Sequence, residues 1–353
     1  MEKWKECTIS DIGTVVGGAT PSTKVPENYI EGRIAWITPK DLSTFHSRYI
    51  EHGERNITER GLHTCSTTLL PPNTILFSSR APIGYIAIAK NALCTNQGFK
   101  NIIPNTNIHP LFLYYLLKNN KDRIENMGSG TTFKEVSAAV MNSISIRIPE
   151  KIQIQQKITK LLGSLDDEIE LNRQINANLE QQAQAIFKEM FIDNGLKNVK
   201  KGMLQDIAEI TMGLSPDGSS YNKKQLGIIF FQGRAEFGDR FPKIRLYTSQ
   251  PKRIAIRNDI LMSVRAPVGD INIAHHDCCI GRGLASIRSK YNHQSFLFYT
   301  MLNLKKYLDR FNSEGTVFGA ISKEALNTIP IDIPSEGKIK HFEQIASPID
   351  TNI

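Results

Sequence analysis

A proline-free stretch from Lys151 to about Phe191 constrains the fold of this 353-residue chain more than any other feature. Its apolar side chains recur every three or four residues, which is the period of a helix and not of a strand. Pro149 lies just before the stretch and Gly195 just after it, as is usual at helix ends. We therefore predict a helix of about forty residues, roughly 60 Å long at about 1.5 Å per residue.

The apolar stripe of this helix is narrow, so it predicts packing against another long helix, with ordinary core packing as the alternative. Polar residues fill the other faces, which excludes a membrane span. An asparagine lies within the stripe, where a buried amide is expected to set the register. The residues expected to pack against a partner helix are Leu161, Leu165, Ile169, Asn172, Ile175, Leu179 and Ile186.

The segments on either side of the helix repeat each other. Residues 77–89 read FSSRAPIGYIAIA and match LMSVRAPVGDINIA at 261–274. Residues 130–149 read GTTFKEVSAAVMNSISIRIP and match GTVFGAISKEALNTIPIDIP at 315–334. A constant offset of 185 residues aligns the copies from Arg80 onwards. A period this long indicates a duplicated domain and not a solenoid.

Each copy consists of short strand-like runs with one helix-length run, 111–117 in the first and 296–302 in the second. This pattern predicts an α+β fold, with two homologous mixed α/β domains separated by a long coiled-coil-forming helix. The end of the chain, IASPIDTNI, resembles LLGSLDDEI at 161–169, so we expect a truncated second long helix there. The predicted segments are a first domain at 1–150, a spacer helix at 151–194, a second domain at 195–335 and the second helix at 336–353.

The net charge of +8 favours an acidic partner, with nucleic acid first. The N-terminus lacks the apolar segment of a secretion signal, so we expect a cytoplasmic protein. The five cysteines include no CxxC pair and do not suggest a disulfide framework. Residues 275–279 read HHDCC, but such direct adjacency is wrong for a metal chelate, so we expect no metal site.

Motifs for catalysis are missing from the sequence. It has no GxxxxGK[ST] phosphate loop, no GxGxxG after a strand, no HExxH and no GxSxG. It also lacks the Asn-Pro-Pro-Tyr-like tetrapeptide that an amino-methyltransferase offers to a flipped base. We therefore expect neither catalysis nor a cofactor in this chain.

Two divergent domains with RAPxG and GTxF segments, and a helix containing LDDEIELNRQ and NLEQQAQAIFKEMF, together resemble a Type I restriction-modification specificity subunit. The resemblance covers essentially the whole chain. It implies a non-catalytic subunit whose two target recognition domains each read half of a split double-stranded DNA sequence. It also implies two antiparallel helices that fix the gap between the halves. The resemblance further implies that methyltransferase (modification) subunits, expected to be two, dock on these helices and that restriction subunits join to complete the nuclease complex.

Candidate DNA contacts follow from the repeat. Arg80 and Arg265 occupy equivalent turns, where a phosphate clamp and an arginine paired with a carboxylate are equally good interpretations. The GT segments are expected to present backbone amides to a phosphate, with a turn kept for its shape as the alternative. Base readers are expected where the copies differ. The residues predicted to bind DNA are Lys40, Arg80, Asn96, Gln97, Ser129, Thr131, Lys134, Gln232, Arg234, Arg265, Arg282 and Thr316.

Three other interpretations stay open at the level of sequence. With a truncated second helix, the chain is expected to take a helix from a second copy or from the modification subunits. A homodimer through residues 151–191 would read palindromic sites, because protein symmetry is mirrored in the site. A silent or regulatory variant that inhibits assembly is the alternative function. A single-chain restriction-methyltransferase is disfavoured by the missing motifs.

Overall fold

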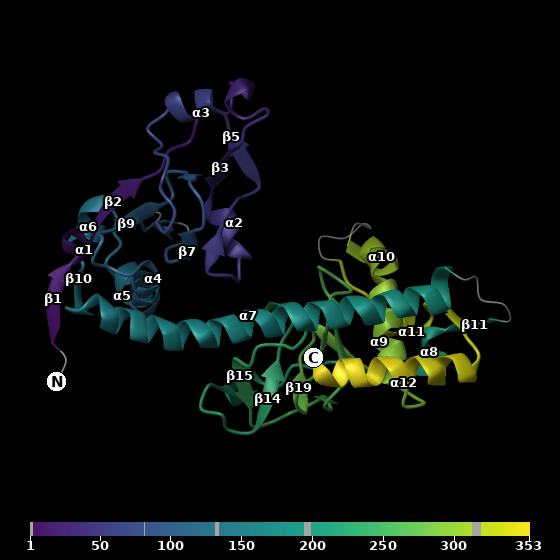
Figure 1. The fold of residues 1–353 in the computed structure, drawn as a ribbon. Coiled ribbons are helices and arrows are strands. Elements are labelled where there is room, and N and C mark those ends of the chain that lie inside the picture. Colours follow the sequence, from purple (N-terminus) through teal and green to yellow (C-terminus); the bar gives the residue numbers. More distant parts are fainter. Residues whose placement is uncertain (1–2, 81, 131–133, 194–198, 313–318) are drawn as a thin grey trace. The chain divides into compact units, whose positions relative to one another are not determined.

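The computed structural model of the chain describes residues 3–80, 82–130, 134–193, 199–312 and 319–353 (Figure 1). The chain forms two compact units, Met1–Arg173 and Gln174–Ile353. The boundary between the units falls inside helix α7 (Ile152–Lys188), which continues into a π-helical turn, η2 (Glu189–Asp193). The long helix predicted from the apolar period is therefore confirmed. Within the described residues, no helix is long and apolar enough to cross a membrane.

The first unit contains a five-stranded sheet, a three-stranded sheet and a two-stranded ribbon. The five-stranded sheet has the order β2 (Gly13–Gly17), β9 (Lys100–Pro104), β6 (Ile75–Phe77), β7 (Ile86–Ala89) and β4 (Tyr49–Ile50). The three-stranded sheet has the order β5 (Arg55–Ile57), β3 (Ile34–Ile37) and β8 (Cys94–Thr95). The ribbon pairs β1 (Trp4–Thr8) with β10 (Ser145–Pro149), so both ends of the predicted first domain meet.

Short helices connect these strands. They are α1 (Ile9–Ile12), η1 (Pro26–Asn28), α2 (Pro39–Ser43), α3 (Glu59–His63), α4 (Pro110–Asn119), α5 (Lys121–Asn126) and α6 (Ala138–Ser143). Helix α4 buries Phe112, Leu113 and Leu117 against Ile75 and Phe77 of the five-stranded sheet. The start of α7 packs on the same core and so belongs to this unit.

The second unit repeats this architecture. One sheet has the order β12 (Ala208–Met212), β20 (Leu284–Ser289), β17 (Ile260–Ser263) and β18 (Ile271–Ile273). The other has the order β13 (Tyr221–Asn222), β15 (Leu246–Thr248), β14 (Ile228–Phe231), β19 (Cys278–Ile280) and β16 (Ile254–Ala255). The ribbon pairs β11 (Lys200–Met203) with β21 (Pro330–Ile333). The helices are α8 (Leu204–Ile207), η3 (Gly218–Ser220), η4 (Arg234–Glu236), α9 (Gln294–Asn303), α10 (Lys305–Leu308), η5 (Asp309–Asn312), α11 (Lys323–Asn327) and α12 (Glu336–Asn352).

Strand pairing confirms the duplication, with one correction. β3 runs parallel to β8 in the first unit, and β14 runs parallel to β19 in the second. The offset of 185 is not constant, however, because the connection before α9 is one residue shorter than the connection before α4. The two helices start at Pro110 and Gln294, so Tyr115 corresponds to Tyr299 and not to Thr300. At the serine N-caps of α6 and α11, Ser137 and Ser322, the offset is 185 again.

The C-terminal part of α7 is buried in the core of the second unit. The Phe187 ring lies 5.5 Å from Phe342 of α12 and 5.9 Å from Phe296 of α9, measured between ring centroids. Phe191 contacts the same two rings. This aromatic cluster fixes α12 along α7 within the second unit (Figure 1).

Candidate nucleic-acid interface

Three segments far apart in sequence meet beside the RAPxG turn of the first unit. The amide of Ser79 donates to the carbonyl of Gly98 at 2.7 Å, and the amide of Val136 donates to the carbonyl of Ser79 at 2.9 Å. A fourth segment joins them, because the amide of Ala19 donates to the carbonyl of Thr95 at 3.0 Å. We call this group of segments, 18–20, 38–40, 79–80, 95–98, 129–130 and 134–136, the first reading edge.

The second unit builds the same edge from equivalent segments. The amide of Val264 donates to the carbonyl of Gly283, and the amide of Ile321 donates to the carbonyl of Val264, both at 3.0 Å. The amide of Gly213 donates to the carbonyl of Leu284 at 2.9 Å. Residues 213–215, 232–234, 264–266, 281–283 and 319–321 form the second reading edge.

Close backbone approach explains why a glycine recurs at the start of each edge. A Cβ atom on Gly18 would lie 2.2 Å from the carbonyl oxygen of Asn96, and one on Gly213 would lie 2.1 Å from that of Gly281. Both distances are far below van der Waals contact, so only glycine fits without moving the neighbouring strand. The two copies therefore keep one backbone frame.

The predicted DNA contacts of the first unit gather at its edge. The backbones of Arg80 and Ser129 both bridge to Glu135, so the arginine, the serine and the adjacent exposed Lys134 come together. The side chain of Glu135 forms an ion pair with Lys100 at 3.2 Å. Among the described residues, the Arg80 side chain has no carboxylate partner, so the paired-arginine interpretation has no support. Thr131 and Thr316 lie outside the described residues.

Local contacts occupy some of the predicted base readers. The Asn96 side-chain oxygen accepts a hydrogen bond from the amide of Gly98 at 2.8 Å, which leaves its NH₂ group for a ligand. The side-chain oxygen of Gln97 accepts a hydrogen bond from the Thr20 hydroxyl, a contact that sequence reasoning missed. The amine of Lys40 lies 2.7 Å from Glu54 in an exposed ion pair. Such a pair contributes little to stability and exchanges readily with other anions.

The second edge carries a different set of side chains. Gln232, Arg265 and Arg282 are exposed, and Arg282 takes the place that Gln97 has in the first unit. The carbonyl of Gln232 accepts a hydrogen bond from Gly283, so its side chain starts directly at the edge. Arg234 forms an ion pair with Asp270. Arg234 is one of the residues predicted from the sequence, whereas Asp270 is not.

Each unit also fixes a buried arginine against helix carboxylates. In the first unit, the Arg48 side chain is 8% exposed and pairs with Asp167 and Glu170 of α7. Its Nη1 also donates to the carbonyl of Gly163 at 3.3 Å. Beside it, the Tyr115 hydroxyl donates to Asp166 at 2.8 Å. We call this group the first helix anchor.

The second helix anchor has the same chemistry. Arg240 pairs with Glu180 of α7 at 3.2 Å and with Asp350 of α12 at 2.6 Å, and its guanidinium lies over the Phe298 ring. The Tyr299 hydroxyl donates to Asp350 at 3.0 Å. Burial, the Asp350 charge and this hydrogen bond raise the pKa of Tyr299 above its ordinary value. The spacing of the two arginines does not fit the repeat offset, so sequence alignment of the copies did not find them.

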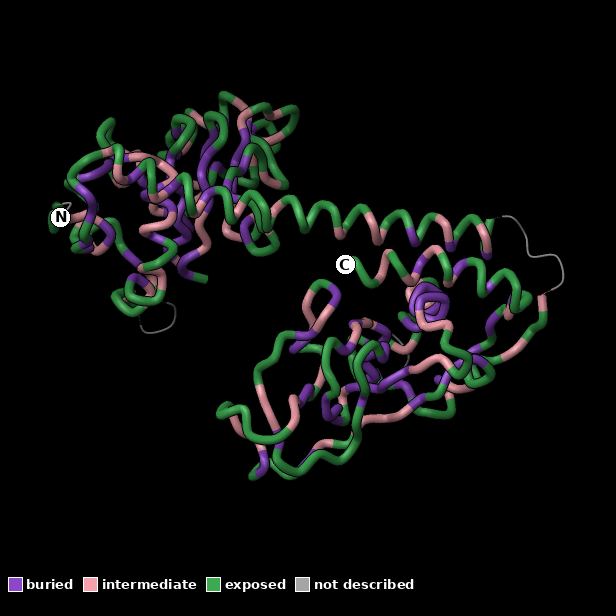
Figure 2. The backbone as a smooth tube through the Cα atoms, turned by 60° about the horizontal axis from the view of Figure 1, so that its bottom comes forward, coloured by how far each residue is buried: buried purple, intermediate pink, exposed green. Residues whose placement is uncertain are grey.

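The predicted partner stripe of α7 divides into exposed and buried parts. In the first unit, Leu161, Leu165 and Ile169 are all exposed, Leu161 to 65%. In Figure 2, much of the long helix carries the colour of exposed residues. In the second unit, Ile175 is exposed and Leu179 is half-buried. Asn172, the predicted register residue, is exposed in this chain. Ile186 is half-buried and packs against the core of its own unit, next to Phe187, so its packing against a partner helix stays a prediction.

The fold, with its two matching edges and helix anchors, defines a class of protein. The chain belongs to the Type I restriction modification DNA specificity domain family, whose model matches residues 1–181 and 197–351. The resemblance found in the sequence and the predicted fold class are both confirmed. The family is one of DNA specificity domains, in agreement with the expectation that this chain is not an enzyme.

Two individual relatives show how similar the chain is to known specificity subunits and how much of them it spans. The chain is 38% identical over 300 residues to the Type I restriction enzyme MjaIX specificity subunit of Methanocaldococcus jannaschii, and the match covers 84% of this chain but 65% of that protein. The chain thus spans slightly less than two thirds of that relative. It is 35% identical over 311 residues to the putative MjaX specificity subunit of the same organism, covering 78% of this chain and 71% of the relative.

A solved structure shows the same fold. The Type-I restriction-modification system S subunit from M. genitalium superimposes with a TM-score of 0.61 at 16% identity, covering 99% of this chain and 90% of that one. At this identity the similarity concerns the fold alone.

Proposed function

We propose that this chain is the DNA specificity subunit of a Type I restriction-modification complex and that each reading edge contacts one half of a split target. One observation carries this proposal: the two edges share a backbone frame but differ in their polar side chains. Asn96 and Gln97 of the first edge correspond to Gly281 and Arg282 of the second. A shared frame with different donors and acceptors is what reading two different half-sites requires.

Charge supports DNA as the ligand. The chain carries a net charge of +8, and Arg80, Lys134, Arg265 and Arg282 lie on the two edges without an ion-pair partner among the described residues. Cationic side chains of this kind neutralise phosphates and release counterions, which makes binding tight at low salt. Uncharged polar groups such as the Asn96 NH₂ group then supply sequence preference.

The exposed stripe of the first unit, Leu161, Leu165 and Ile169, is proposed to dock a helix of a modification subunit. Apolar residues at helical spacing on one face of a helix are typical of a helix–helix interface, whereas scattered exposed leucines are not. Two modification subunits are expected to supply methyl transfer, and restriction subunits to supply cleavage. This chain supplies the choice of sequence.

The same stripe also supports a second candidate function. A second copy of the chain could cover it, giving a homodimer that reads a palindromic site, or a silent variant that inhibits assembly. Mass measurement of the purified chain, alone and with modification subunits, separates these outcomes. A dimer that dissociates when modification subunits are added would support docking at the stripe by both partners.

The test of the proposed function is a map of methylated bases in the genome of the source cell, with and without this reading frame. Loss of a split motif on deletion is the expected result. Loss of a palindromic motif would favour the homodimer. An unchanged map would contradict the proposed function and favour the silent variant.

A further inference from the structure

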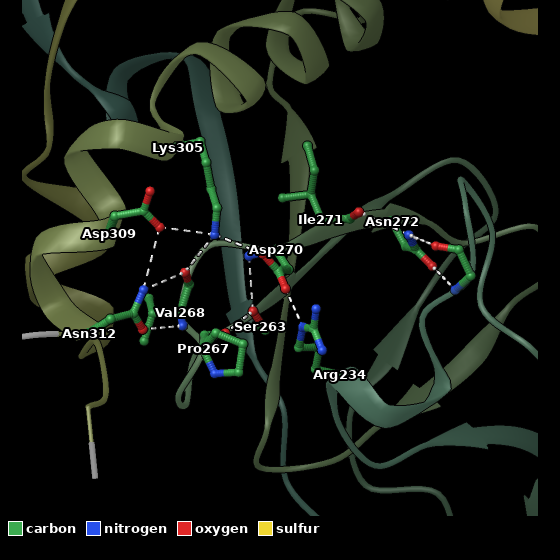
Figure 3. A network of polar contacts seen from close by, with 11 residues as sticks. Arg234, Ser263, Pro267, Val268, Asp270, Ile271, Asn272, Lys305, Asp309 and Asn312 are labelled. Carbon is green, nitrogen blue, oxygen red and sulfur yellow. Dashed lines mark hydrogen bonds and ion pairs between the residues drawn. The ribbon is translucent and has the colours of Figure 1, made fainter. Parts of the chain in front are cut away.

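Arg234 lies in η4, directly after strand β14, and extends from the second reading edge toward the turn that follows the RAPxG segment (Figure 3). Its Nε–H donates to one carboxylate oxygen of Asp270. The side chain is 54% exposed. Among the described residues, its two terminal nitrogens have no hydrogen-bond partner.

Other arginines in the described chain that pair with carboxylates use their terminal nitrogens on the protein. Arg48 and Arg240 both donate from Nη1 and Nη2, and each side chain is less than a tenth exposed. Arg288 binds Asp259 through both Nε and Nη2. Arg234 differs because its carboxylate partner takes only Nε. The contact orients the guanidinium plane and leaves its outer fork open.

Asp270 is itself held in place through both its carboxylate and its backbone. Lys305 donates to the other oxygen of Asp270 at 2.7 Å, and the Asp270 amide donates to the Ser263 hydroxyl at 3.0 Å (Figure 3). Lys305 in turn pairs with Asp309 at 3.1 Å. Burial raises the pKa of Asp270, but hydrogen bonds from Lys305 and Arg234 outweigh it, so the pKa lies below its ordinary value. Asp270 is therefore charged and fixed at neutral pH.

An open groove lies beside the guanidinium of Arg234. A groove of about 410 Å³ is lined by both ends of the ion pair, by Lys305 and by the backbone of Gly238 and Gly269. A base edge that is exposed in the DNA major groove needs such open space to approach an oriented donor pair. Lys40, which takes the place of Arg234 in the first unit, pairs with Glu54 on the surface and offers no planar fork.

Resting on the proposed function, we propose that Arg234 reads a guanine in the half-site of the second unit and that Asp270, supported by Lys305, is the positioning residue for it. Two parallel N–H donors match the O6 and N7 acceptors of guanine, and no other base pair presents that pattern in the major groove. An arginine fork also pairs with phosphate. What favours base readout is that Arg234 lies where the polar side chains of the two copies differ, Lys40 in one and Arg234 in the other.

The test replaces the wild-type gene by single variants in cells that carry the modification subunits, and maps methylated sites. Arg234→Lys keeps the charge but loses the fork, and Asp270→Asn keeps the shape but loses the charge that orients it. Glu54→Gln is the control, since it breaks a surface ion pair of Lys40, the residue that takes the place of Arg234 in the first unit. All three positions are at least partly exposed, so folded protein is expected, and its amount is measured in parallel.

The expected result is that one guanine of one half-site becomes degenerate in Arg234→Lys, with roughly 5- to 150-fold discrimination lost. Asp270→Asn should relax the same position by about tenfold, and Glu54→Gln should leave the motif unchanged. A uniform loss of methylation with no change of motif in Arg234→Lys would identify a phosphate contact and overturn the inference. If the methylated motif of Asp270→Asn is as strict as that of the wild type, Asp270 does not position Arg234. A wild-type strain without any motif would instead contradict the proposed function.

Discussion

The helix anchors and the reading edges of this duplicated chain have diverged to different extents. Both anchors bury an arginine between acidic side chains of long helices and place a tyrosine–aspartate hydrogen bond next to it. The edges keep only their backbone frame, and equivalent positions carry Gln97 in one unit and Arg282 in the other. The comparison indicates that attachment to the helix is common to both copies, whereas the polar side chains of the edges, which we propose read DNA, are particular to each.

The anchors themselves differ in one respect. Arg48 finds both of its carboxylates on α7, whereas Arg240 takes Glu180 from α7 and Asp350 from α12. The second anchor thus ties two helices and the recognition domain together. We expect its loss to cost more, because one substitution loosens three elements.

The largest expected effect is that of Arg240→Ala. The substitution leaves Asp350, largely buried, without its cation, and the free energy of unfolding should fall by about 3 kcal/mol. Arg48→Ala should cost less, because Asp167 is 70% exposed and regains water when the arginine is removed. Denaturant unfolding of both variants measures the difference. An equal or larger loss for Arg48→Ala would contradict this account of the anchors.

A smaller loss of stability is expected when a side chain is added at a glycine of the shared backbone frame. Gly18→Ala should lower the free energy of unfolding by about 2 kcal/mol, since its Cβ would meet the carbonyl of Asn96. Gly17→Ala is the matched control on the neighbouring residue, where a Cβ meets nothing within 4 Å. Thermal unfolding of the two variants tests the comparison. If they unfold alike, close approach is not the reason for the glycine.

A pH-dependent effect of about 1 kcal/mol is expected at Tyr299. Its pKa is raised in the folded chain, whereas in the unfolded chain it is about 10. The contribution of this group to stability is therefore complete below pH 10 and is lost as the pH rises toward the folded value. Unfolding free energies measured from pH 8 to 11 should fall less steeply for Tyr299→Phe than for the wild type. Parallel curves for the two proteins would show that the phenol does not titrate in this way.

The smallest effect on stability is expected on the exposed stripe. Leu165→Gln should change the free energy of unfolding of the isolated chain by less than about 0.5 kcal/mol, because the leucine already faces water. It should nevertheless weaken assembly with modification subunits. Ile186→Gln, on the same helix but packed in its own unit, should destabilise the chain directly. Unimpaired assembly of Leu165→Gln would exclude the stripe as a docking surface.

Local patterns in the sequence predicted the architecture. The apolar period from Ile154 to Met190 is a local signal, and it placed the long helix within a few residues. The repeat predicted two domains because segments such as RAPxG and GTxF retain their spacing within each copy. The repeat also placed Arg80 and Arg265 at equivalent positions, which the backbone bridges to Glu135 and Ala320 confirm.

Contacts between distant segments were not predictable in the same way. Arg48 meets Asp167 across more than a hundred residues, and no spacing in the sequence links the two. Asp270 sits in the match between RAPIGY and RAPVGD, where the first copy has a tyrosine, so alignment marked it only as a difference. The packing of Ile186 against the core of its own unit was not predictable for another reason. A helical period shows which residues share a face but not which neighbour covers each turn of it.

The central claim is that the two edges read separate halves of one target, and single variants on each edge test it most directly. Methylated sites are mapped in cells that carry Gln97→Ala or Arg282→Ala in place of the wild-type chain. We predict that each variant relaxes one half of the motif only, a different half in each case, and leaves the gap between the halves unchanged. A variant that relaxes both halves, or two variants that relax the same half, would contradict the account.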